Sequence, residues 1–196
     1  MTNAPDEGYV NYFEILGVDQ ESKPGEVRKE YRRKMKDLVN EINSVEITES
    51  RRARFLLEMA KLNAALFLLR ETDLREAFWK ERAALIDLEA RWRAADDTDP
   101  RQADRLRGEF DGRVRTFLST YLEELMLGAG RDKECVEASG WDEAHERHAS
   151  RIIRQYRHTL YHKILERLPF ADVTRPQIDW DERRATVSSL ISQGTL

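Results

Sequence analysis

Apolar residues recur every three or four positions along most of the chain, which is the spacing of amphipathic α-helices. The sequence also holds only 9 Gly and 5 Pro, which is few for an all-β protein with its many turns. We therefore predict an all-α fold. The stretches with helical spacing are residues 26–38, 51–69, 74–95, 101–127 and 141–164, followed by a predicted terminal helix over 177–192.

Turn and capping residues indicate where these helices begin and end. Gly17 closes a short apolar stretch. The run Asp96-Asp97-Thr98-Asp99-Pro100 supplies carboxylates and a Thr for capping, followed by a Pro suited to the first helical position. Asn40–Thr48 weakens the helical pattern with Asn, Ser and β-branched residues, so we predict a loop there, which could include a frayed helix end. Residues 131–140, around Cys135, are predicted to form a polar loop.

The pattern predicts two parts, with a boundary after residue 79. Residues 9–79 are expected to form a small helical domain. Residues 80–196 are expected to form a C-terminal helical bundle with a terminal docking tail. In this bundle, two long helices joined by the glycine-rich turn at 128–130 should pack as a long antiparallel helix hairpin, because each has a single apolar stripe.

Charge and composition indicate which partners and which cellular compartment suit the protein. The net charge of −4 means that bulk electrostatics do not favour nucleic acid. Cys135 is the only cysteine, which rules out an intramolecular disulfide and fits a reducing compartment. Met1–Gly8 has no apolar run of signal-peptide type, and Ala64–Leu69 is far shorter than the roughly 20 apolar residues that cross a bilayer. We predict a cytoplasmic protein without membrane insertion.

Three short motifs occur in order in the first third of the chain. Tyr12–Val18 has the sequence Y-F-E-I-L-G-V, and Pro24–Arg33 has the sequence P-G-E-V-R-K-E-Y-R-R. Leu62–Leu66 has the sequence L-N-A-A-L, followed by R-E-A-F at Arg75–Phe78. In this order and at this spacing, the motifs resemble the J-domain (DnaJ-like) family, the helical module by which co-chaperones engage Hsp70. The resemblance implies a J-type fold over residues 9–79 and a protein partner, either Hsp70 or another J-protein.

The resemblance also implies where a partner would bind. J-domains dock on Hsp70 through a basic helix face, which corresponds here to Arg28, Lys29, Arg32, Arg33 and Lys36. The same charges could equally be ordinary solvated side chains that keep a small domain soluble.

The His-Pro-Asp tripeptide, by which J-domains make Hsp70 hydrolyse ATP, is missing. Counting on from Tyr31, its place is taken by Val39, Asn40 and Glu41. Val and Asn replace neither a titratable imidazole nor a rigid proline, and Glu41 keeps only a carboxylate. We therefore expect a degenerate J-like domain that does not stimulate Hsp70.

The overall layout, a J-like domain followed by a helical bundle, is similar to that of the co-chaperone of iron–sulfur cluster assembly usually called Hsc20. Leu69–Phe78 is similar to that family's "L-R-x-P-x-x-R-A-x-Y", without its Pro. Trp141–Ala144 opens the last long helix much as "W-D-A-A" does in that family. No segment corresponds to the family's scaffold-binding residues.

A histidine pair offers a second type of site. His158 and His162 lie four residues apart, which places them on one helix face where they could share a metal. The nearby segment offers Asp142, Glu143 and Cys135 as further ligands. The plainer interpretation is that both histidines are polar positions on a solvated face, since one spacing match is a weak signal.

Two further features could bind a partner. Arg147, Arg151, Arg154 and Arg157 form a basic edge that suits phosphate or carboxylate, or that pairs with acidic residues of this chain. Ile178 and Trp180, set among Pro and acidic residues, are typical of a docking segment, either onto the protein's own bundle or onto a partner.

Three functions are compatible with these observations. The first is a non-catalytic adaptor or scaffold, built from a degenerate J-like domain and a helical bundle. The second is a genuine Hsp70 co-chaperone, resembling Hsc20, that acts through an altered loop. The third is a metal-dependent helical enzyme. Because the sequence contains no phosphate loop, no Ser-His-Asp order and no activated cysteine context, we expect no enzymatic activity and no cofactor.

Overall fold

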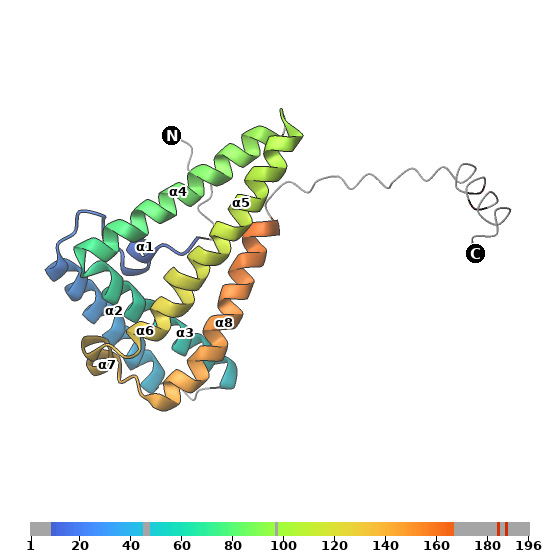
Figure 1. Ribbon diagram of the computed structural model, residues 1–196. Coiled ribbons are helices and arrows are strands. Elements are labelled where there is room, and N and C mark those ends of the chain that lie inside the picture. Colours follow the sequence, from blue (N-terminus) through green and yellow to red (C-terminus); the bar gives the residue numbers. More distant parts are fainter. Residues whose placement is uncertain (1–8, 45–47, 97, 167–183, 185–186, 188–196) are drawn as a thin grey trace.

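The structure is a computed structural model that describes residues 9–44, 48–96 and 98–166, together with Arg184 and Val187. Its described residues form helices and turns without any strand, which confirms the all-α class (Figure 1). The elements are α1 (Tyr12–Leu16), α2 (Pro24–Ser44), α3 (Glu49–Leu69), α4 (Thr72–Asp96), α5 (Pro100–Leu118), the π-helical turn η1 (Ser119–Glu124), α6 (Leu125–Ala129), α7 (Lys133–Ser139) and α8 (Glu143–Glu166).

The capping signals predicted from the sequence are confirmed. Gly17 ends α1 in the left-handed conformation, with φ of 72°, which a residue with a side chain rarely adopts. Asp99 caps α5 by accepting hydrogen bonds from the backbone N–H groups of Arg101 and Gln102, and Pro100 occupies the first turn.

The loop predicted over Asn40–Thr48 is wrong in its first half, because α2 continues to Ser44. Leu38, Val39 and Ile42 are half-buried and pack against the core, so the apolar stripe of α2 extends past the weak helix formers. The burial of this stripe outweighs the modest propensity cost of Asn and β-branched residues in a helix.

The polar loop predicted over 131–140 is also wrong, since it contains α7. Asp132 caps this helix by accepting from the backbone N–H of Cys135, and Gly140 ends it in the left-handed conformation. Cys135 is fully buried, so one side of this short helix belongs to the core.

The long helix predicted over 101–127 is interrupted by η1. In a π-helical turn the backbone hydrogen bonds are shifted, and the turn often lies where a side chain enters the ladder. Here the buried Tyr12 hydroxyl donates to the backbone carbonyl of Tyr121 over 2.7 Å. The N-terminal segment is thereby tied to the middle of this long helix.

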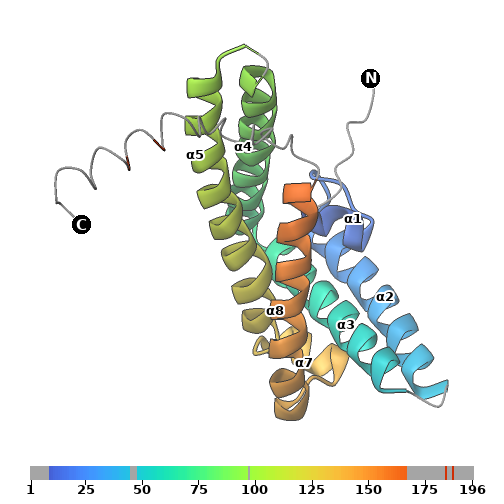
Figure 2. The ribbon, with the colours of Figure 1, turned by 90° about the vertical axis from the view of Figure 1, so that its right-hand side faces the viewer.

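Two helix pairs dominate the arrangement. α4 and α5 lie side by side along their length, and α2 and α3 form the second pair (Figures 1 and 2). α8 packs against α3, η1 and the lower end of α5, and α7 lies against α2 and α3. Because α5 packs chiefly against α4, the hairpin predicted between 101–127 and 141–164 is not confirmed.

A single hydrophobic core runs through the described residues, from Tyr9 to Ile164. The predicted boundary after residue 79 falls inside α4. Aromatic rings bridge it: Phe78 stacks on Phe117 of α5 with centroids 5.9 Å apart and lies 5.5 Å from the ring of Tyr12. The two predicted parts thus share one buried aromatic cluster.

Several residues of the motifs that resemble the J-domain are buried in this core. Tyr12, Leu16, Leu66 and Phe78 are fully buried. Arg75 is also buried, and its guanidinium donates to the carbonyl of Leu69 and, over 2.7 Å, to that of Ser22. Arg75 thus binds the carbonyl that ends α3 and the loop before α2.

Some features of the sequence lie on the surface or beyond the described residues. Leu74, which continues the helical spacing at the start of α4, is 41% exposed. Apart from Arg184 and Val187, the predicted terminal helix, including Ile178 and Trp180, lies outside the described residues. No helix in the described part is long and apolar enough to cross a membrane.

Candidate interaction surface on helix α2

Helix α2 has one buried face and one basic face. Val27, Tyr31 and Met35 are each 1% exposed and face the core. The five predicted partner-binding residues lie on the remaining surface: Arg28, Lys29, Arg32, Arg33 and Lys36. Their placement follows from helical periodicity, because the basic residues fill the positions between those of the buried stripe.

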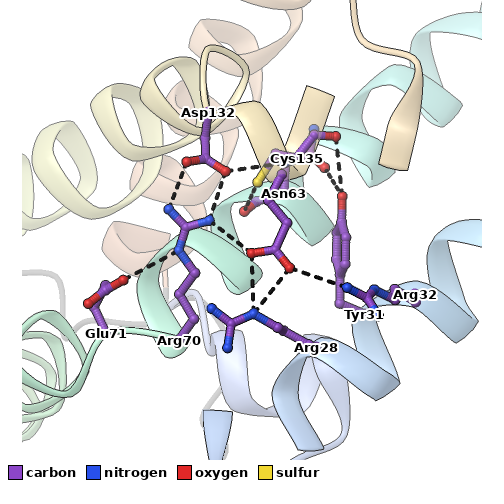
Figure 3. A network of polar contacts seen from close by, with 9 residues as sticks. Arg28, Tyr31, Arg32, Asn63, Arg70, Glu71, Asp132 and Cys135 are labelled. Atoms are coloured by element: carbon purple, nitrogen blue, oxygen red, sulfur yellow. Dashed lines mark hydrogen bonds and ion pairs between the residues drawn. The ribbon is translucent and has the colours of Figure 1, made fainter. Parts of the chain in front are cut away.

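Glu134 of α7 contacts the first turns of this basic face. The Arg28 guanidinium donates to both carboxylate oxygens of Glu134, over 3.1 and 3.3 Å (Figure 3). Arg32 lies 3.7 Å from the same carboxylate. Two of the five predicted docking residues therefore already have an acidic partner within the protein.

An arginine–carboxylate pair fixes the start of α7 beside this contact. Arg70 of α3 donates to both oxygens of Asp132 over 2.8 and 2.7 Å, the two-pronged geometry that arginine favours (Figure 3). The hydrogen bond from Arg70 lowers the pKa of Asp132 to about 2, despite partial burial, which acts in the opposite direction. Glu134 adds a longer contact to Arg70, at 3.4 Å.

A buried neutral network continues from this pair into the core. The Tyr31 hydroxyl donates to the side-chain carbonyl of Asn63 over 2.8 Å, and the Asn63 amide donates to Ser139 over 3.3 Å. Ser139 in turn donates to the backbone carbonyl of Cys135 over 2.7 Å. Burial raises the pKa of both Tyr31 and the Cys135 thiol, so both groups stay neutral at physiological pH.

The rest of the basic face is more open. Arg33 pairs within α2, with Glu30 at 2.8 Å and Asp37 at 3.9 Å. Lys29 and Lys36 are exposed, and within the described ranges neither has an ion pair or hydrogen bond. These two lysines are the most available cations on α2.

The tripeptide position lies within α2 instead of in a loop. Val39 is half-buried and contributes to the core, whereas Asn40 and Glu41 are exposed. Glu41 lines a groove of about 650 Å³, together with Lys34, Lys61 and other residues of α1, α2, α3 and α8. Asn40, which stands at the position of the Pro, continues a regular helical turn and cannot impose the backbone restriction of a proline.

The predicted metal ligands do not all come together. The rings of His158 and His162 have centroids 4.2 Å apart, and both line a small cavity beside Arg115 and Arg157. Cys135 is buried on the inward side of α7, and no three His, Cys, Asp or Glu side chains among the described residues form a set that could hold a metal ion.

The predicted basic edge of α8 divides into two halves. Arg154 and Arg157 pair with Glu123 of η1, at 3.0 and 2.9 Å. Arg147 and Arg151 are exposed at a different place, along the groove between α3 and α8.

Comparisons of the chain with models of known protein families, with curated proteins and with solved structures gave no match. The J-domain resemblance therefore stays a prediction from the three motifs.

Sequence reasoning did not find Arg70, Asp132 and Glu134, which hold α7 against α2 and α3. A signal for α7 was present: Asp132 directly follows a glycine-containing turn, with Glu134 in the next turn, as at many helix starts. The pairing itself could not be predicted, because Arg70 and Asp132 are 62 positions apart in the sequence.

Proposed function

We propose that this protein is a non-catalytic adaptor, in which a degenerate J-like segment is built into a helical body and binds a protein partner through the open part of the α2 basic face. The contact of Glu134 with Arg28 and Arg32 carries this proposal. A surface that an internal carboxylate already occupies is a poor site for an acidic face of Hsp70, since binding would first have to break these pairs.

Two further observations support an adaptor over an enzyme or an active co-chaperone. Val39, Asn40 and Glu41 continue the helix without a His or a Pro. Burial raises the pKa of Tyr12, Tyr31 and Cys135, and each of these groups donates a hydrogen bond inside the protein and stays neutral. Strongly shifted groups at an active site would be expected to face a cleft.

The second candidate, a genuine Hsp70 co-chaperone, is favoured by one observation. Lys29 and Lys36 are exposed and unpaired among the described residues, so part of the implied docking face is still available. This candidate requires stimulation of ATP hydrolysis, which the adaptor does not.

An ATPase assay with Hsp70 from the same host separates the two candidates. We expect the full chain to leave the Hsp70 rate unchanged, and the variant Glu134→Gln, which frees Arg28 and Arg32, to leave it unchanged as well. Stimulation by the wild-type chain that is lost in a Lys29→Glu, Lys36→Glu variant would refute the adaptor and support the co-chaperone.

A cross-linking experiment tests the adaptor directly. A photo-reactive amino acid at position 36 should capture a host protein, whereas the same group at Arg91, an exposed position on α4, should not. Capture at position 36 should be lost in the Lys29→Glu background. Equal capture at both positions, or none at position 36, would contradict a partner-binding role for this face.

A further inference from the structure

A groove of about 750 Å³ lies between the first half of α3 and the middle of α8. Its apolar lining includes Leu57 of α3 and Ile152 and Tyr156 of α8, all half-buried and packed on the core. At this groove α3 and α8 do not pack closely, so one side of the hydrophobic core is accessible.

Arginines surround this apolar lining. Arg54 of α3 and Arg147 and Arg151 of α8 all line the groove and are exposed. Unlike Arg154 and Arg157 further along α8, none of the three has an ion pair within the described part of the chain. Glu49 is the one carboxylate in the lining, so the rim is strongly cationic.

The chain contains a segment with the complementary chemistry. Ile178–Glu182 has the sequence I-D-W-D-E, in which two large apolar residues alternate with acidic ones. Its apolar residues match the groove lining, and its three carboxylates match the three unpaired arginines. Arginine is well suited to bind carboxylates in this setting, because its fork donates two hydrogen bonds.

The connection is long enough for this segment to reach the groove. Along α8, Gln155 at the groove lies about 16 Å before Glu166, at about 1.5 Å for each helical residue. The 12 residues from Glu166 to Ile178 can span up to about 40 Å when extended. The return distance is thus well within the reach of the chain.

We propose that Ile178–Glu182 docks in the α3–α8 groove of its own chain, with Ile178 and Trp180 on the apolar lining and the carboxylates at the arginine rim. This inference does not depend on the adaptor function. Its consequence is that an external acidic segment could use the groove only by displacing this tail, so the tail acts as a built-in competitor.

Intramolecular cross-linking in the full chain tests the proposal. Cys135 is buried, so introduced cysteines are the accessible thiols. The test chain carries Thr159→Cys in the groove and Gln177→Cys beside the segment, and the control chain carries Ala90→Cys on exposed α4 with the same Gln177→Cys. With a short thiol cross-linker, we expect about tenfold or more intramolecular product in the test chain than in the control.

Charge variants make the test specific. Reversing the rim with Arg54→Glu and Arg151→Glu should lower the yield to that of the control, and adding Asp181→Arg and Glu182→Arg should restore it. These positions are exposed or lie outside the described helices, and circular dichroism checks that each variant folds. Equal yields in the test and control chains, insensitivity to rim reversal, or cross-links only between chains would each overturn the proposal.

Discussion

The Arg70–Asp132 pair offers the sharpest test of how α7 is held in place. The variant Asp132→Asn removes the negative charge while keeping a side-chain oxygen that can still cap α7. The exposures of the two side chains are only 13% and 15%, so solvent screens this pair weakly. The variant therefore measures the charge contribution of one partly buried contact.

The pKa of Asp132 sets the expected size of the effect. Arg70 lowers this pKa from 3.8 to about 2 in the folded protein. Such a lowering corresponds to about 2.4 kcal/mol of unfolding free energy at pH 7, and to about 1.3 kcal/mol at pH 3. Because the folded pKa is depressed, this stability is fully present above the ordinary pKa and is lost as the pH falls through about 2.

Urea unfolding followed by circular dichroism measures the difference between wild type and Asp132→Asn at pH 7, 5, 4 and 3. Glu71→Gln is the matched control, since Glu71 also approaches Arg70, at 3.6 Å, but its side chain is 60% exposed. We expect the control to change stability by less than about 0.5 kcal/mol. An Asp132→Asn effect no larger than the control, or one that does not shrink between pH 5 and pH 3, would refute this reasoning.

Three further predictions concern the core. Gly130→Ala should destabilise the fold by about 1–3 kcal/mol in thermal unfolding, because the added Cβ would lie 2.7 Å from Trp141 Nε1. Gly128→Ala, which has open space around it, should be neutral or stabilising. Equal effects of the two variants would contradict this reasoning. Tyr12→Phe should cost about 1 kcal/mol in urea unfolding by leaving a buried carbonyl of η1 without its donor, and an unchanged midpoint would argue against that bond. Cys135 should react with Ellman's reagent at pH 8 only in denaturant, since burial raises the pKa of its thiol; rapid reaction of the folded protein would show that α7 opens.

The sequence predicted features that depend on neighbouring residues. The helix class, the cap at Asp99 and the buried stripe of α2 all follow from spacing and side-chain chemistry within a few turns. Local propensity does not predict the extension of α2 to Ser44, because that extension depends on the burial of Val39 and Ile42 against the core.

The candidate site was only partly predictable for a different reason. Helical periodicity predicts that Arg28 and Arg32 lie on one exposed face, but it does not show what lies opposite them. Glu134, which contacts both arginines, is 106 positions from Arg28 in the sequence. It belongs to α7, a short helix that local patterns did not reveal. Contacts at such a separation depend on the packing of the whole chain, so they could be found only in the structure.

The π-helical turn η1 has a consequence for tolerance to length changes. Each residue added to or removed from an α-helix rotates everything beyond it by about 100°. η1 lies between α5, which faces α4, and α6, which faces α3, so this turn sets the rotational phase between two different partners. Deleting one residue there would turn α6 and the start of α7 away from α3, carrying Asp132 out of reach of Arg70 without altering either side chain. The number of residues in η1 therefore matters as much to the basic face of α2 as the identity of the residues that contact that face.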